Sequence, residues 1–372
     1  MTTRIKLLGL LLTITTVFQG WAQQTSETVT INGVTRNYIL YKPANFQASE
    51  NMPVVFVLHG LGSDNVTMTA TGFSQIADTA RFIVIYPQGV NNTFGSASWN
   101  NGTALSSNVD DVGFFITLIE DMVANQGANR NRVYFTGFSM GSIMSHHMAC
   151  LMNDKIAAIG AMAGTMATVD IDNCVPTYKT PVIHLHGTDD GTVPYDENPL
   201  PGLSLVPETM EFWRNVHGCT TNTDSSRIAD TASDNITIDR FVYTDCIEED
   251  VLELWRFNGA DHIYLFEPFN DITEAKEIWK FFAQWTHPNA SSSANLTEEG
   301  KSSSFKLSPN PSKGAITIES DYEGKFNIYN VAGQKVETIR LKKGTNQMKL
   351  KLPQGIYLLQ LPQSSVKIEI QK

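Results

Sequence analysis

Short apolar runs alternate with amphipathic segments along the first three quarters of the chain. The runs are almost continuously apolar, as in strands that are buried on both faces; they are "MPVVFVLHG", "FIVIYPQG", "RVYFTGFSMG", "IAAIGAMAG", "PVIHLHG" and "VLELWRFNG". The segments between them have the apolar periodicity of helices; they are "VDDVGFFITLIEDMVANQG", "SIMSHHMACLM", "ETMEFWRNVHG" and "ITEAKEIWKFFAQW". Strands that alternate with helices predict an α/β fold with a mostly parallel central sheet.

The start of the chain has a pattern of its own. Arg4 and Lys6 precede a short apolar run, which is followed by the small residues Gly20 and Ala22. This order predicts a signal peptide over residues 1–22 that is cleaved on export. The apolar run is shorter than the roughly 20 residues needed to cross a membrane, so we do not expect an anchor. After it, "SETVTINGVTRNYILYKP" alternates as a strand pair does, with Asn32-Gly33 as its turn.

The composition changes after Trp285. The stretch "HPNASSSANLTEEGKSSS", which begins at His287, is polar and rich in serine and therefore predicts a flexible linker. Beyond it, short alternating runs separated by turn residues predict a small β-sandwich. We expect a main domain over residues 23–290, a linker over residues 291–304 and a second domain over residues 305–372.

The net charge and the spacing of the cysteines limit which partners and metals we expect the chain to bind. The formal net charge is −11, and no basic run stands out in the first three quarters, so nucleic acid is not an expected partner. The 4 cysteines show no CxxC spacing, so neither zinc nor another metal is expected. In an exported protein they indicate disulfides. Three pairings are possible, and we favour Cys150–Cys174 with Cys219–Cys246 because they close the shortest loops.

One short motif carries the chemistry. Ser139 stands in "GFSMG", between a buried strand and a helix. Gly137 and Gly141 allow a sharp turn there, which would present the serine hydroxyl at the carboxyl end of the sheet. A serine hydroxyl becomes a nucleophile when a base accepts its proton and a carboxylate orients that base. The usual chain order on this kind of turn is serine, acid, histidine.

That order restricts the choice of base and acid. His262 directly follows the last apolar run and is the predicted base. Asp189 and Asp190 both follow "PVIHLHG"; only one of two adjacent side chains can face the base, and we prefer Asp190. Asp245 and Asp261 are weaker candidates. Two further acidic residues, Asp110 and Asp111, precede Ser139 at the start of a helix and are interpreted as a cap and a structural hydrogen-bond partner.

The developing oxyanion needs two backbone N–H groups. Met140 supplies one, and Leu61, with Gly60 as the alternative, supplies the other from the loop "HGLGSDN". We interpret His59 as a core residue that shapes this loop. Aromatic residues near the site are candidates for the substrate wall, although core packing is an equal alternative for each: Trp99, Tyr195, Tyr264 and Phe266.

From Tyr41 to Trp285 the chain resembles the secreted esterase family that includes polyhydroxybutyrate depolymerases, feruloyl esterases and acetylxylan esterases. The matching stretches are "VVFVLHG", "VIYPQG", "SWN", "VDDVGFF", "RVYFTGFSMG", "HLHGTDDGTVPY" and a late "DH". The resemblance implies an α/β-hydrolase fold with Ser139, Asp190 and His262 as the triad. It also implies a Cys219–Cys246 pair.

The last region resembles the C-terminal sorting domain of the type IX secretion system. The matching stretches are "LSPNPSKG", "FNIYNVAGQKV" and "LPQGIYLLQL". The resemblance implies contact with that secretion machinery and a final place outside the cell or on its surface. A substrate-binding module is the alternative, but the region lacks the aromatic clusters of such modules.

Together these features predict an exported serine carboxylic-ester hydrolase that works through an acyl-enzyme, as a monomer and without a cofactor. We expect its substrate to be an ester in a polymer, with feruloyl or acetyl groups of plant polysaccharide as the first choice. A polyhydroxyalkanoate or other polyester depolymerase is the alternative. A serine peptidase of the prolyl-oligopeptidase kind would carry a propeller domain, and none fits here. A non-catalytic surface binding protein with the same fold is the remaining possibility.

Overall fold

The structure is a computed structural model that describes residues 22–247, 251–288, 290, 305–320, 323–330, 335–361 and 364–371. The predicted linker and all but the last residue of the predicted signal peptide lie outside this part of the chain. Within the described residues, no helix combines the length and apolar character needed to cross a membrane.

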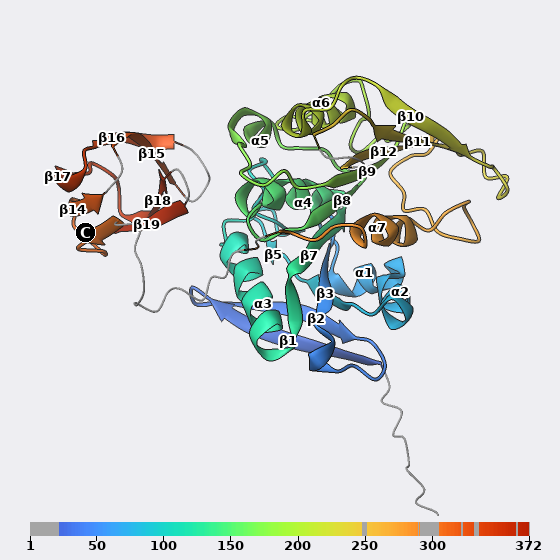
Figure 1. The fold of residues 1–372 in the computed structure, drawn as a ribbon, viewed down its shortest axis with the longest axis horizontal. Helices are drawn as coiled ribbons and strands as arrows, with labels where there is room; N and C mark the ends of the chain where they lie inside the picture. The colour runs from blue at the N-terminus through green and yellow to red at the C-terminus, as the bar shows by residue number, and fades with distance from the viewer. Residues whose placement is uncertain are drawn as a thin grey trace, which may run out of the picture.

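A 10-stranded sheet forms the centre of the first unit, in the order β1-β2-β4-β3-β7-β8-β9-β12-β11-β10 (Figure 1). The strands from β4 to β12 in this order run parallel, and the two at each edge are added antiparallel. Their bounds are β1 Gln23–Ile31, β2 Val34–Lys42, β3 Met52–Leu58, β4 Ile83–Pro87, β7 Ala128–Phe138, β8 Ala158–Met162, β9 Val182–Gly187, β10 Thr223–Ile228, β11 Thr237–Tyr243 and β12 Leu252–Asn258. The mostly parallel sheet predicted from the apolar runs is therefore confirmed.

Helices cover both faces of the sheet, because its central strands are apolar on both sides. In β3, Phe56 packs into one core cluster and its neighbours Val55 and Val57 into the other, as the period of two in a strand requires. One cluster contains residues of α3 (Asp111–Asn125), α4 (Met140–Leu151) and α6 (Val206–His217). The other contains residues of α1 (Asn65–Met68), α2 (Phe73–Ala80) and α7 (Glu274–Phe282). The smaller elements are η1 Ala48–Glu50, η2 Thr69–Thr71, β5 Val90–Asn91, β6 Ala97–Ser98 and α5 Thr168–Asn173.

Some elements were not predicted from the sequence. The edge strands β10 and β11 and the helices α1 and α2 are the main ones. The sequence of β10, "TDSSRI", has almost no apolar pattern, and most of its side chains are exposed. Pairing with β11 holds it in place, and a pairing partner is not visible in a local sequence pattern.

The C-terminal unit has two small antiparallel sheets around its own apolar core. One has the order β13-β14-β17 and the other β16-β15-β18-β19. The bounds are β13 Phe305–Ser308, β14 Ala315–Ser320, β15 Gly324–Asn330, β16 Lys335–Leu341, β17 Gly344–Lys349, β18 Gly355–Leu361 and β19 Ser364–Ile370. Ile318, Ile328 and Leu359 are fully buried between them. The predicted small β domain is confirmed.

Candidate active site

Ser139 lies on a strained turn between β7 and α4. Its φ is 56° and its ψ is −119°, which is an unfavourable backbone conformation for a residue with a side chain. The turn is tight enough to exclude side chains at both glycines of the motif. A Cβ on Gly137 would lie 2.5 Å from the carbonyl carbon of Gly141, and a Cβ on Gly141 would lie 2.2 Å from the carbonyl oxygen of Leu58. The two glycines are therefore required by the geometry of the turn.

His262 and Asp190 meet at the carboxyl edge of the sheet. Asp190 follows β9 and His262 follows β12, and these two strands are parallel neighbours. His262 Nδ1 lies 2.7 Å from Asp190 Oδ2. The imidazole packs on Phe138, the residue before Ser139, with 4.8 Å between ring centroids. Because Nδ1 donates to the carboxylate, Nε2 of a neutral His262 is free to accept a proton.

Asp190 is held firmly in its ionised form. Its side chain is buried, and burial by itself would raise the pKa of the carboxyl. Hydrogen bonds from His186, His262 and the Val193 N–H outweigh burial and hold the pKa of Asp190 well below its usual range. The second oxygen, Oδ1, accepts from the backbone N–H groups of Thr192 and Val193 at 2.8 and 2.7 Å. Both oxygens of this carboxylate are therefore fixed in place.

The other acidic candidates have different positions. Asp189 is exposed and accepts a hydrogen bond from the neighbouring Thr188 hydroxyl. Asp261 is exposed and accepts from the backbone N–H groups of Gly191 and His262, so it ties the two loops together through the backbone. Asp245 is exposed and interacts with Thr220 and Asn222. None of these three carboxylates has a hydrogen bond to the His262 ring.

The loop after β3 lies directly beside Ser139. A Cβ on Gly60 would be 3.2 Å from Ser139 Cβ and 3.7 Å from its hydroxyl oxygen. The backbone N–H groups of Leu61 and Met140 have no acceptor among the described residues. Two unengaged N–H groups on the segments that flank a serine hydroxyl are what an oxyanion site provides.

His59 shapes this loop, as the sequence analysis proposed. It is fully buried, and burial lowers its pKa. Its Nε2 accepts from the Gly89 N–H at 2.9 Å, so in the neutral ring the proton is on Nδ1, which lies 2.7 Å from the Gly60 carbonyl oxygen. The Gly60 carbonyl and the Leu61 N–H belong to one trans peptide group and point in opposite directions. By holding the carbonyl, His59 sets the direction of the Leu61 N–H.

Comparison with known proteins shows which fold the first unit has. The acetyl xylan esterase from Aspergillus awamori superimposes with a TM-score of 0.51 at 18% identity, over 70% of this chain and 99% of that one. The fold is that of the α/β-hydrolases. Residues 45–200 match the family model of phospholipases and carboxylesterases. Residues 306–372 match the secretion-system C-terminal sorting domain, so the predicted place outside the cell or at its surface is supported by a family match.

Two curated proteins to which the chain is similar are named as esterases. The chain is 25% identical over 257 residues to a bifunctional acetylxylan esterase/xylanase of Neocallimastix patriciarum, covering 68% of this chain and 34% of that protein. It is 28% identical over 199 residues to feruloyl esterase B of Piromyces equi, covering 50% of this chain and 36% of that protein. The chain thus spans about a third of the length of these two relatives. The resemblance drawn from the sequence motifs is confirmed.

The predicted substrate wall needs one correction. Trp99 is fully buried, and its Nε1–H donates to the His59 carbonyl at 2.8 Å. Its ring has no exposed face, so we assign it to the support of the loop after β3 and not to the wall. Tyr195 is half-buried and packs edge-on against His186. Phe266 is 45% exposed.

Tyr264 fixes the loop of His262 to the rest of the first unit. Its hydroxyl donates to the Thr71 carbonyl at 2.7 Å and accepts from the Ala275 N–H at 2.9 Å. The hydroxyl is thus engaged in the fold, and any substrate contact would be through the ring. Glu274 of α7 adds a second anchor, because its carboxyl accepts from the Leu265 N–H at 2.7 Å. Glu274 is not predicted from the sequence, where its only signal is a carboxyl at the start of an amphipathic helix.

The two acidic residues that precede Ser139 have the structural roles predicted for them. Asp110 caps α3 by accepting from the Gly113 N–H, and Asp111 forms a buried ion pair with Arg36. His287, which begins the polar stretch interpreted as a linker, is buried, and its N–H donates to the Asn131 carbonyl. The interpretation of this residue as part of the linker is wrong, because it packs in the first unit.

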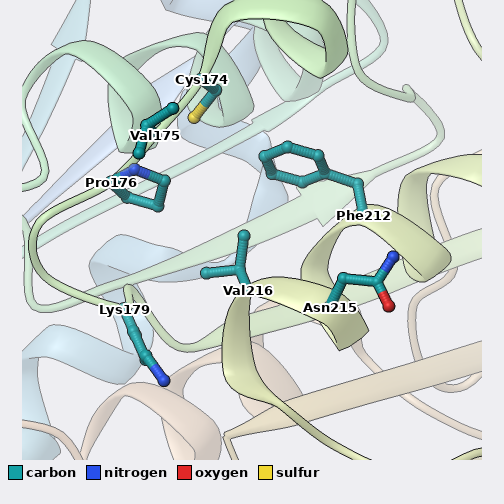
Figure 2. A pocket seen from close by; sticks show the side chains of 7 residues that line it. All are labelled: Cys174, Val175, Pro176, Lys179, Phe212, Asn215 and Val216. Atoms are coloured by element: carbon teal, nitrogen blue, oxygen red, sulfur yellow. The ribbon is translucent and has the colours of Figure 1, made fainter.

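The favoured disulfide pairing, Cys150–Cys174 with Cys219–Cys246, is present. The first pair borders an open pocket of about 340 Å³ that α6 lines from the other side. Figure 2 shows Phe212 and Val216 of α6 opposite Val175 and Pro176. The lining includes none of the proposed triad or oxyanion residues.

A group of three carboxylates could hold a cation. Oxygen atoms of Asp230, Asp234 and Asp271 lie within 4.8 Å of one another. Each already accepts hydrogen bonds from nearby groups of the chain; Asp271, for example, accepts from the backbone N–H groups of Thr231 and Ala232. Local structure thus accounts for their arrangement.

Proposed function

We propose that the chain is an exported serine esterase whose triad is Ser139, His262 and Asp190. The observation that carries the proposal is the 2.7 Å bond between His262 and a buried, ionised Asp190, beside a strained serine turn. Strain of this kind is costly to maintain and is concentrated at functional sites. A purely structural histidine–aspartate pair would not require a serine held in this conformation next to it.

The proposed reaction follows from the positions of these groups. The Ser139 oxygen attacks the carbonyl carbon of the ester while its proton passes to His262 Nε2. The oxyanion that forms accepts hydrogen bonds from the N–H groups of Leu61 and Met140. Collapse of this intermediate expels the alcohol, which takes the proton from His262, and leaves an acyl-enzyme. Water then attacks the acyl group with His262 as base, and the carboxylic acid leaves.

We propose feruloyl or acetyl esters of plant polysaccharide as the substrate class. The support is the likeness to an acetylxylan esterase and a feruloyl esterase. The sorting domain supports the same assignment, because an exported enzyme can reach polymers that do not enter cells. We further propose that the chain acts as a monomer and that its C-terminal domain contacts the type IX secretion machinery.

The test uses the full-length mature protein and its Ser139→Ala variant. We expect hydrolysis of acetylated xylan or methyl ferulate, and a loss on the order of 10⁴ to 10⁶ in kcat for the variant at unchanged melting temperature. Polyhydroxybutyrate belongs in the same substrate panel; hydrolysis of this polyester alone would favour a depolymerase. Binding of a polymer without turnover of any ester would favour a non-catalytic surface protein.

A further inference from the structure

A column of three buried histidines lies behind the acid of the proposed triad. His184 and His186 project from the same face of β9, and His146 comes from α4; all three are fully buried. The rings of His184 and His186 stack at 5.3 Å and 9°, and those of His146 and His184 at 5.6 Å and 30°. The column ends at Asp190, with His186 Nε2 3.3 Å from Asp190 Oδ2. The reaction proposed above uses none of these three rings.

The proton on His186 can be placed from its neighbours. His186 Nε2 lies 2.8 Å from the carbonyl oxygen of Val193, which can only accept a hydrogen bond. Nε2 therefore carries a proton, and the same N–H is shared with the carboxylate of Asp190. The other ring nitrogen, Nδ1, lies 3.2 Å from His184 Nε2.

The rest of the column favours this arrangement. Burial lowers the pKa of His146 to about 3 and the pKa of His184 well below its usual range, so both rings are neutral. The Trp213 Nε1–H donates to His146 Nδ1 at 3.1 Å, which fixes that tautomer. A neutral His184 with its proton on Nε2 donates to His186 Nδ1, so the proton of a neutral His186 stays on Nε2, facing Asp190.

We propose that His186 is a positioning residue for the catalytic acid, and this inference rests on the proposed serine-esterase function. Asp190 Oδ2 accepts a hydrogen bond from His262 Nδ1 at 2.7 Å, and on another side it lies 3.3 Å from His186 Nε2, whose N–H it shares with the Val193 carbonyl. With Oδ1 held by two backbone N–H groups, the carboxylate cannot rotate. The N–H of His186 also partly neutralises the negative charge on Asp190 Oδ2, so this oxygen attracts the proton on His262 less strongly.

Removal of the His186 N–H should change both the pH profile and kcat. The charge on Oδ2 would then be directed at His262 alone, which would hold a proton on the imidazole to higher pH. The other titratable groups around the pair are His184, Asp261 and Tyr195, and none of them offers a second donor to Oδ2. The acid limb of the kcat/KM profile should therefore move to higher pH, and kcat should fall because Oδ2 loses one of the two groups that position it.

Three variants of His186 in the full-length protein test the proposal. His186→Leu removes the donor. His186→Gln can place an amide N–H near the position of Nε2, whereas the shorter side chain of His186→Asn cannot reach Asp190. We expect the Leu and Asn variants to lose about 10- to 100-fold in kcat, the range for a hydrogen bond to a charged group, with KM within about threefold. The Gln variant should stay within about threefold of wild type, and the acid limb should move up only where the donor is lost.

His217 supplies the matched control. It is also a buried histidine, and its Nε2 faces only the Thr180 carbonyl. His217→Leu should lower the melting temperature and leave the acid limb in place. If His186→Leu fails to fold, the comparison of Gln with Asn decides. Equal activity of these two variants, or an unmoved acid limb in His186→Asn, would overturn the proposal. An inactive wild-type protein would instead refute the esterase function itself.

Discussion

Replacing the buried carboxyl of Glu274 should change how stability depends on pH. Glu274 is 1% exposed, and burial raises its pKa to about 8, against the 4.5 of an ordinary glutamate. In the folded protein the carboxyl stays protonated up to about pH 8, whereas in the unfolded chain it ionises above pH 4.5. Stability from this group is therefore fully present below pH 4.5 and is lost as the pH rises towards 8.

The size of the effect follows from the two pKa values. Each pH unit between them costs about 1.4 kcal/mol of unfolding free energy. Relative to low pH, the loss is about 3 kcal/mol at pH 7 and about 4 kcal/mol at pH 8, where the folded carboxyl is itself half ionised. In Glu274→Gln the side chain is neutral at every pH and keeps an oxygen for the Leu265 N–H. Because somewhat less than 1 kcal/mol is already lost at pH 5, the free energy of unfolding of the variant should gain about 3–4 kcal/mol on that of the wild type as the pH rises from 5 to 8.

Urea unfolding of both proteins at pH 5, 6, 7 and 8 measures the difference directly. Any constant cost of the amide cancels when the difference is followed across pH. As a control, Glu253 is also buried but pairs with Arg240, so Glu253→Gln should destabilise the protein by removal of an ion pair. If the difference between Glu274→Gln and wild type is flat from pH 5 to 8, Glu274 is not held neutral in the fold and the reasoning is refuted.

Three further predictions concern the acid, the serine turn and the disulfides. Asp190→Asn should lower kcat by roughly 10⁴ because the base loses its orienting carboxylate, while Asp189→Asn should stay near wild type in the same kinetic assay; the reverse order would assign the acid role to Asp189. Gly141→Ala should lower the free energy of unfolding by about 1–3 kcal/mol or more, since its Cβ meets backbone; an unchanged urea midpoint would contradict this. Replacing Cys219 and Cys246 with serine should lower the free energy of unfolding by roughly 3–4 kcal/mol, as expected for a bridge across 27 positions. An unchanged melting temperature in calorimetry would contradict this.

Much of this protein can be predicted from local sequence. The apolar runs specify the central strands because a strand covered on both faces must be apolar at every position. The serine turn is equally local, because Gly137 and Gly141 adjoin the residue that they serve. The order of Ser139 before His262 along the strands was enough to select the base, since parallel strands present their carboxyl ends at one edge.

Other features depend on contacts between residues that are distant in sequence. Asp189 and Asp190 have the same local pattern, and only the pairing of β9 with β12 shows which one reaches His262. Trp99 resembles a surface aromatic until the loop after β3 covers it. His287 follows a polar pattern, yet it packs against the loop around Asn153.

The contacts of the three buried histidines in the column also depend on tertiary structure. A single buried histidine and an exposed one look alike in sequence, because the apolar pattern of β9 says only that the side chain is covered. Whether the ring faces solvent, a carbonyl or the carboxylate of Asp190 depends on which loop folds over it. The sequence thus determined the strands, the turn and the chain order of the proposed catalytic groups. The tertiary structure decided which polar atoms face one another, because hydrogen bonds form between neighbours in space.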